Sequence, residues 1–328
     1  MMVSRKSLAL VSFGTLLLLL ACGKEKDRGS APPPTKEEGR ALDVATLPAE
    51  TRVIIGARVP QILASPVLRR LVDRALAHDP DARARLESLL GRCKIDLSRD
   101  VERVTIAMAD AADVALLVSG KIDPAALVAC VRAEAGELSE SQHDGRTVYA
   151  TGRDGQRVWL TVAEGSLVAA TSERWMDALL DPAKPSIATR ADTQALLARV
   201  DRDAAVWGVG YLPPGSETRM AELTGGKVAA PPKAVTFTVT LGKPTPIDAS
   251  LRLEMASPGD ATALVDVASK QRDLLAIAAQ RHGLGRMVSK TNIDADGTGL
   301  RLALRLDEPD VRLLEEAMSP KAEKEQGR

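Results

Sequence analysis

Apolar and polar positions alternate along much of the chain in short segments, a pattern typical of half-buried β-strands. In the first half the expected strands are residues 52–59, 101–108, 114–119, 146–151, 157–162 and 167–170. In the second half they are residues 205–211, 234–241, 247–255, 287–294 and 300–306. Because the segments alternate and do not form continuous apolar runs, we expect antiparallel sheets with one wetter face.

Helix start signals interrupt these strands. Asp123-Pro124 and Ser257-Pro258 each place a capping residue before a proline at the first helical position. They predict helices that run through Ala135 and to about His282. The further expected helices are residues 60–91, 173–180 and 308–318.

The same order of elements occurs twice. A strand, an Asp-Pro or Ser-Pro helix, a hairpin and a closing helix recur at a spacing of roughly 135 residues. The pattern predicts an α+β fold with two tandem similar halves, residues 49–184 and 192–320. Each half is expected to be an antiparallel sheet with helices packed on one face.

The amino-terminal segment has the pattern of an export signal. Arg5 and Lys6 precede an uncharged, mostly apolar run over residues 8–21. A helix of that length spans about 21 Å, which is short of the ~30 Å hydrocarbon core of a bilayer. The segment therefore favours a secretory signal peptide over a transmembrane helix.

The end of this run, Leu19-Leu20-Ala21-Cys22-Gly23, resembles the lipobox of bacterial lipoproteins. The resemblance implies a signal peptide over residues 1–21 and fatty acyl chains, such as palmitate, attached at Cys22. Several acyl chains together give stable membrane anchoring. Gly23 and Lys24 lack the aspartate that retains enteric lipoproteins in the inner membrane, which favours the outer membrane. The alternative is an ordinary cleaved leader that ends beside a chance cysteine.

Two terminal segments have the composition of disordered chain. Residues 22–48 are rich in proline and in charges of both signs, and residues 321–328 are polar. Such segments bury too little apolar surface to offset their ordering entropy. We expect the first to be a tether that holds the body away from the bilayer, with the protein facing the periplasm.

The body between these segments is similar in pattern to the duplicated α+β envelope lipoproteins of myxobacteria and their relatives. The similarity rests on the Leu47-Pro48-Ala49 opening, Cys93 followed by Asp96, and the Asp123-Pro124 helix start. No established activity comes with this resemblance.

Composition argues against nucleic acid as a partner. Lys+Arg and Asp+Glu are both 44, aromatic residues are only 2% of the chain, and mean hydropathy is −0.06. A near-neutral body has no broad field to attract polyanions, and scarce aromatics offer few stacking platforms for bases.

Two cysteines remain once Cys22 is modified. Cys93 and Cys130 form an even pair in an oxidising compartment, which predicts a disulfide. The alternative is two buried free thiols that act as small hydrophobic residues.

No sequence motif marks a catalytic residue, a cofactor site or a metal site. The three histidines, His78, His143 and His282, lie far apart and are expected to be solvated residues at helix ends and a turn. Asn292, Asp294, Asp296 and Gly297 imitate the start of a calcium loop, but the position of the required glutamate is Ala303. We therefore expect a hairpin turn there.

These patterns predict a lipid-anchored, non-catalytic binding or scaffold body, whose partner is another envelope protein or a small ligand. A hydrolase built from scattered carboxylates and a carrier of an apolar ligand stay open as alternatives. A binding body should expose an apolar patch or groove. A hydrolase should have a deep cleft with carboxylates of perturbed pKa, and a carrier should have an aliphatic cavity.

Overall fold

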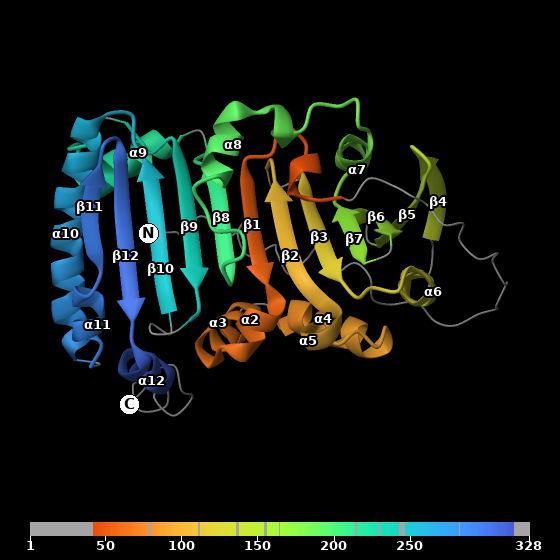
Figure 1. Cartoon of the computed structure of the whole chain (residues 1–328), viewed down its shortest axis with the longest axis horizontal. Helices are drawn as coiled ribbons and strands as arrows, with labels where there is room; N and C mark the ends of the chain where they lie inside the picture. The colour runs from red at the N-terminus through yellow and green to blue at the C-terminus, as the bar shows by residue number, and fades with distance from the viewer. Residues whose placement is uncertain are drawn as a thin grey trace. The chain divides into compact units, whose positions relative to one another are not determined.

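The computed structural model describes residues 42–317 apart from short gaps at 78–79, 111, 136–137, 154–155, 164, 214, 229, 243–246 and 282. Helices and antiparallel strands make up this body, so the predicted α+β class is confirmed (Figure 1). Chain contacts divide it into two compact units. Unit 1 contains residues 42–51 and Leu71–Gln194, and unit 2 contains Arg52–Arg70 and the chain from Ala195.

This division differs from the predicted organisation in three segments. Residues 42–48, expected to be disordered tether, belong to unit 1, where Leu47 is fully buried and accepts from the amide of Ile187. Residues 192–194, expected in the second half, also belong to unit 1. Residues 52–70 belong to unit 2, although they precede most of unit 1 in the sequence. The reason is the pairing of β1 (Val53–Arg58) with β8 (Val206–Tyr211), in which Ile54 lies opposite Val209. Strand pairing of this kind depends on distant residues and leaves no local signal.

Unit 1 contains six antiparallel strands in the order β2-β3-β7-β6-β5-β4. Their bounds are β2 Val101–Met108, β3 Val114–Gly120, β4 Leu138–His143, β5 Arg146–Arg153, β6 Gln156–Ala163 and β7 Ser166–Ala170. The helices within the unit are α4 (Pro80–Arg92), α5 (Leu97–Asp100), α6 (Pro124–Ala135) and α7 (Glu173–Leu180). The short helices η2 (Val44–Thr46) and η3 (Ile187–Thr189) also belong to it, and α3 (Pro66–Ala77) and α8 (Ala191–Leu197) cross the division between the units.

Helices cover both faces of the unit 1 sheet. On one face, Leu127 and Val131 of α6 pack on a row that contains Leu116, Leu160 and Ala169. The other face carries α7, because Asp177 of α7 pairs with His143 of β4. His143 lies opposite Arg146, and alternation along β5 puts both on the face away from α6. Buried Trp175 and Met176 of α7 explain this second layer, which differs from the expectation that helices cover one face only.

Unit 2 contains six antiparallel strands in the order β11-β12-β10-β9-β8-β1. The bounds not yet given are β9 Ala234–Thr240, β10 Ile247–Glu254, β11 Asn292–Asp296 and β12 Gly299–Leu306. Its helices are α2 (Val59–Ala64), α9 (Ser216–Thr224), α10 (Pro258–Gln280), α11 (Gly285–Ser289) and α12 (Glu308–Ala317).

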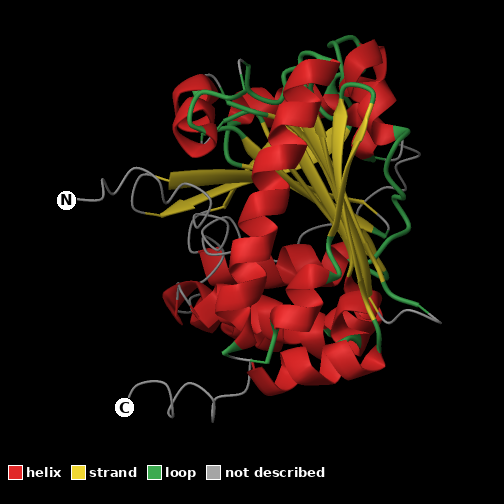
Figure 2. Ribbon diagram, turned by 90° about the vertical axis from the view of Figure 1, so that its left-hand side faces the viewer, coloured by secondary structure: helices red, strands yellow, loops and turns green. Residues whose placement is uncertain are grey.

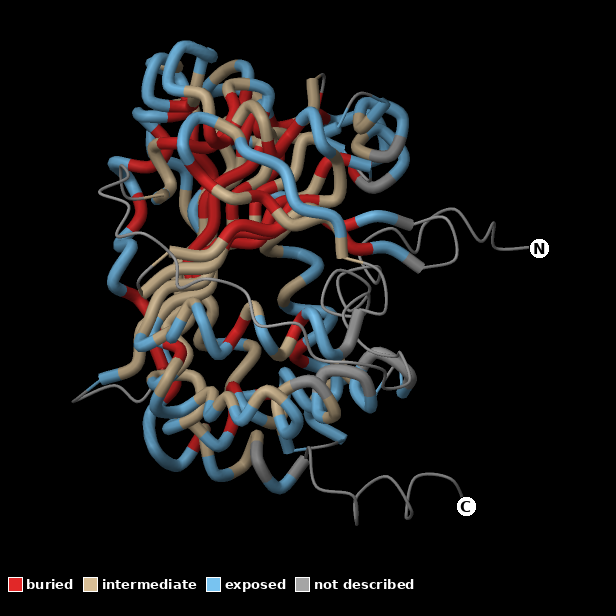
Figure 3. Tube along the Cα trace, turned by 90° about the vertical axis from the view of Figure 1, so that its right-hand side faces the viewer, coloured by how far each residue is buried: buried red, intermediate tan, exposed pale blue. Residues whose placement is uncertain are grey.

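The apolar clusters of unit 2 lie on one face of its sheet. Ala261 and Leu264 of α10 pack with Leu300, and further along β12 Leu306 packs with Val311 of α12. Alternation along β12 puts Leu300 and Leu306 on the same face. The opposite face carries polar side chains, among them Thr236, Thr238, Ser250, Arg252 and Arg301. Figure 3, viewed from the side opposite to Figure 2, shows buried residues gathered along the strands and exposed residues on the helices and connections.

Four strands in each unit share one order. In unit 1 it is β2-β3-β7-β6, with α6 between β3 and β6 in the sequence. In unit 2 it is β9-β10-β12-β11, with α10 between β10 and β11. The final strand leads into a helix in both units, α7 in the first and α12 in the second.

Two expected elements differ from the structure, and one strand was not expected. The helix expected over 60–91 is divided into α2, α3 and α4, because Pro66 and Pro80 each begin a new helix and extended Ser65 precedes the first of them. The strand expected from Met287 begins only at Asn292. Met287 lies in α11 and packs in the cluster of Leu306. Strand β4 was not predicted.

None of the helices in the described part of the chain combines the length and the apolar character needed to cross a bilayer.

Candidate binding surface

Cys22, the residue expected to carry lipid, lies outside the described residues, as do the leader, most of the tether and the carboxyl-terminal tail. His78 and His282 also lie outside them. The structure therefore leaves the anchor as a prediction.

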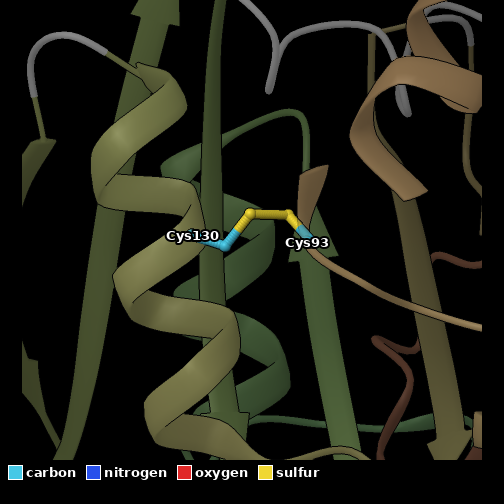
Figure 4. Close-up of a disulfide and its surroundings, with 2 residues drawn as sticks. All are labelled: Cys93 and Cys130. Carbon is cyan, nitrogen blue, oxygen red and sulfur yellow. A yellow bond between two sulfur atoms is a disulfide. The ribbon is translucent and has the colours of Figure 1, made fainter. Parts of the chain in front are cut away.

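The predicted disulfide is present in unit 1. Cys93 follows α4 and Cys130 lies in α6, with 5.4 Å between their Cα atoms (Figure 4). That separation is typical of a disulfide. Cys93 and Ile95 pack against the core cluster under α6, so the bond fastens the chain after α4 to that core. Its position indicates a structural role.

The sequence predicted that His143 is a solvated residue at a turn, and the structure shows that this is wrong. It ends β4, and its Nδ1 lies 2.8 Å from Oδ1 of Asp177. Its Nε2 lies 3.0 Å from the hydroxyl of Ser141. The pair with Asp177 joins β4 to α7.

The segment that imitates a calcium loop is a hairpin turn between β11 and β12, as predicted. The Asn292 amide donates to Asp294, and Asp296 accepts from Arg252 at 2.8 Å. Gly297 has φ +60°, which suits the tight connection. The carboxylates of Asp294 and Asp296 therefore accept hydrogen bonds from side chains of the same protein.

Unit 1 contains a hollow of about 240 Å³ beside the carboxyl end of α7. It is lined by charges of both signs, including Asp144, Arg146, Asp181 and Lys184. Asp181 also accepts a hydrogen bond from the amide of Ala183 at 2.8 Å, and this bond stabilises the turn after α7. The lining is not the aliphatic wall that an apolar ligand requires.

Where carboxylates have shifted pKa values, the shift is downward. The hydroxyl of Ser98 lowers the pKa of Asp96, and the guanidinium of Arg99 lowers that of Asp100. Burial acts to raise the pKa of Asp310, but hydrogen bonds from Lys290 and Arg286 hold it well below its ordinary value. A general acid at neutral pH needs the opposite shift. Asp100 and Asp310 belong to ion pairs, and Asp96 caps α5 by accepting from the amide of Ser98.

The exposed apolar surface of unit 2 lies on the second half of α10. Leu274, Leu275 and Ile277 are 62%, 59% and 63% exposed, the highest values among the large hydrophobic residues that the structure describes. Figure 2 looks at the side that carries α10 and shows the helix passing in front of the strands. We name Leu274, Leu275 and Ile277 the α10 patch.

The opposite side of the same helix segment explains why the patch points outward. Ala276 is buried, and its carbonyl lies 2.8 Å from the position that a Cβ on Gly285 would take. Arg272 donates to the carbonyl of Thr291 at 3.2 Å. The small Ala276 and Gly285 thus let α11 pack closely against α10, which fixes the rotation of the helix.

Basic residues border the patch. Lys270, Leu274, Ile277 and Arg281 follow one another at helical spacing, so they form one stripe along α10. The structure shows no ion pair for Lys270 or Arg281 among the described residues. Sequence reasoning placed this helix but missed its patch, because apolar residues in a helix are expected to face the core.

No model of a known protein family matches the chain. No curated protein sequence matches it either. Two solved structures of TP0453, its crystal forms III and I, each align with a TM-score of 0.45. The first is 11% identical and the match covers 84% of this chain and 99% of that chain, while the second is 12% identical with 85% and 99% covered. At this level of similarity we take neither a fold nor a function from TP0453.

Proposed function

We propose that the protein is a lipid-anchored, non-catalytic component of the bacterial envelope that acts by binding, with the α10 patch as its binding surface. The observation that carries the proposal is three neighbouring aliphatic side chains that remain about 60% exposed on a helix whose buried residues are Ala261, Leu264 and Ala276. Contiguous apolar residues that stay exposed at a cost in hydration free energy mark interaction sites.

The anchor part of this proposal rests on Cys22 and the run of residues before it. Acyl chains on Cys22 hold the body at a membrane, with the outer membrane favoured, and the following segment is the tether. Cells grown with an alkyne fatty acid test this part. The wild-type protein should take up label and sediment with membranes, whereas Cys22→Ser should do neither; equal labelling of the two proteins excludes the anchor.

Two features support binding over catalysis. The shifted carboxylates have lowered pKa values, and the hollow in unit 1 has a lining of balanced charges. Purified protein incubated with a panel of ester, peptide and glycoside substrates should show no turnover above that of a heat-denatured sample. Turnover that is lost on substitution of one described carboxylate overturns the binding proposal.

We also infer that the two units descend from one duplicated ancestor, as the recurring element order in the sequence suggests. The shared order of four strands and the helix that follows the second of them in the sequence, α6 in unit 1 and α10 in unit 2, support this inference. Val101 begins β2 and Ala234 begins β9, while Ser166 begins β7 and Gly299 begins β12, so both pairs are 133 positions apart. A constant offset across elements separated by a long helix is the pattern that duplication leaves.

A further inference from the structure

The residues of the α10 patch lie in a part of the helix that unit 1 lacks. Helix α6 starts at Pro124 and ends at Ala135, and α10 starts at Pro258 but continues to Gln280. The first part of α10 supplies the core residues Ala261 and Leu264. The extension over residues 270–280 carries the patch, and its one buried residue, Ala276, packs against α11. Because unit 1 lacks this extension, the shared four-strand core does not need the side chains of the α10 patch.

The chemistry of the extension is aliphatic at the centre and positive at both ends. Lys270 lies one turn before Leu274, and Arg281 lies one turn after Ile277. Arg272 and Asp273 form an ion pair at 2.8 Å, so they offset each other. Asp266 is the nearest other acidic residue along the helix, one turn before Lys270. The face therefore suits a partner that is negative at its surface and apolar below it.

A second copy of the chain does not meet this requirement. Two antiparallel α10 helices that pair Leu274 with Ile277 would also place Lys270 of one copy opposite Arg281 of the other. Like charges placed opposite each other in this way repel. The occupant must carry the opposite charge.

A folded protein partner also fits poorly. Stable protein interfaces bury about 800 Å² on each side, and their strongest contacts come from aromatic residues and arginine that fill pockets. The α10 patch contains three aliphatic side chains on a convex helix. A surface that deforms around such side chains is a better match than one with preformed pockets.

We propose that the α10 patch inserts into the headgroup region of an anionic lipid bilayer, with Lys270 and Arg281 at the lipid phosphates. Helices that combine aliphatic and basic residues lie in the interface in this way. The inference rests on the proposed function, since the tether keeps a bilayer within reach of the body. A small patch is sufficient because the acyl chains supply most of the membrane affinity. The patch then sets which surface of unit 2 faces the lipid.

The test uses the processed protein purified from the membranes of its own cells and reconstituted in lipid vesicles. Leu274→Cys offers a thiol on the patch for an environment-sensitive fluorophore, since Cys93 and Cys130 are bonded to each other. Leu71→Cys is the matched control, because Leu71 is a leucine on another helix that is 48% exposed. The vesicles contain phosphatidylcholine alone or mixed with phosphatidylglycerol, together with lipids that carry a quencher near the headgroup.

Quenching should be several-fold stronger at position 274 than at position 71, and stronger in the vesicles that contain phosphatidylglycerol. Removing the positive rim with Lys270→Gln and Arg281→Gln should weaken docking on those vesicles by about fivefold for each charge. Equal quenching at the two positions overturns the proposal, as does the absence of quenching at position 274. Disulfide cross-linking between position 274 of two copies assigns the patch to a dimer and also overturns it.

The same preparation separates this inference from the anchor. The mass of the amino-terminal peptide reports whether Cys22 is acylated. Acylated Cys22 with an unquenched label at position 274 removes the docking inference and keeps the anchor. Free Cys22 removes the anchor; because its thiol would also take the fluorophore, quenching is then measured on Leu274→Cys combined with Cys22→Ser, and a quenched label on that protein keeps the docking inference.

Discussion

Helices α6 and α10 begin in the same way and end differently. Each follows a capping residue and begins with a proline, Asp123-Pro124 in unit 1 and Ser257-Pro258 in unit 2. The next strand of the shared order starts at a similar distance, since Pro124 and Gln156 are 32 positions apart and Pro258 and Asn292 are 34 apart. Unit 1 uses that length for the hairpin β4–β5, and unit 2 uses it for the rest of α10 and for α11.

The difference teaches which residues the framework requires. Val131 in α6 and Leu264 in α10 both pack on the sheet, at similar distances from the start of their helices. Beyond Val131 and Leu264 the two units have different elements before the next shared strand. Unit 1 extends its sheet there with largely polar side chains, whereas unit 2 carries the exposed α10 patch.

The largest effect should come from the bond that only unit 1 has. Replacing both partners with Cys93→Ser and Cys130→Ser should lower the free energy of unfolding of unit 1 by about 4 kcal/mol, since the bond closes a loop of 37 residues. Hydrogen exchange should show faster exchange at the amides of α6 and little change in α10. A loss spread evenly over both helices would contradict a role confined to unit 1.

The next effect concerns the core part of α10. Leu264→Ala removes a side chain that is only 8% exposed and should cost about 3 kcal/mol of unfolding free energy. Leu274→Ala in the same helix is the matched control and should change it by less than about 0.5 kcal/mol. Urea denaturation followed by circular dichroism measures both. Similar losses for the two variants would mean that the patch is packed and not free to bind.

The last helix of unit 2 allows a third test. Asp310 is buried at the start of α12, where Arg286 and Lys290 donate to it. It also accepts a hydrogen bond from the backbone amide of Asp307, and the carboxylate of Asp307 accepts one from the backbone amide of Asp310. Asp310→Asn should cost about 2 kcal/mol of unfolding free energy.

The same residue predicts a dependence on pH. Because the pKa of Asp310 is lowered in the folded protein, its contribution is fully present above the ordinary carboxyl value of 3.8. The contribution is lost as pH falls through that value toward the lower folded pKa. Stability measured in urea between pH 6 and pH 3 should therefore fall less steeply for Asp310→Asn than for the wild type. Parallel curves would exclude this linkage.

The smallest effect should come from the corresponding helix of unit 1. Ser172 caps α7 through a hydrogen bond from the amide of Trp175 and donates to Asp113 at 2.6 Å. Ser172→Ala should cost about 1 kcal/mol of unfolding free energy. Ser172→Thr, which keeps the hydroxyl, is the control. An equal loss in both variants would point to crowding at the site and not to the cap.

The sequence predicted elements whose signals are local. The bounds of α6 follow from Asp123-Pro124, and the pairing of Cys93 with Cys130 follows from their number and expected compartment. Strand β4 was missed because Ser139, Glu140, Ser141 and Gln142 give neither apolar alternation nor β-branched residues. The pattern over residues 287–291 predicts a strand, but the segment is helical because Gly285 approaches α10 closely, and that contact depends on tertiary packing.

The candidate site was harder to predict than the fold. The need for an exposed apolar patch could be stated in advance, but its position could not. Leu264 and Leu274 are the same residue type in one helix, yet the first is buried and the second exposed. Which side of the helix meets the sheet is set by Ala276, Gly285 and Arg272, whose contacts form only in the folded protein.

The pairing of β1 with β8 has a consequence for the order in which the chain can fold. Ile54 and Val209 lie opposite each other but are 155 positions apart, so a ribosome completes β1 long before it makes the partner strand. Until then β1 has an open edge that other extended chains can bind. A fragment that ends before Tyr211 therefore cannot close the unit 2 sheet and leaves the edge of β1 open.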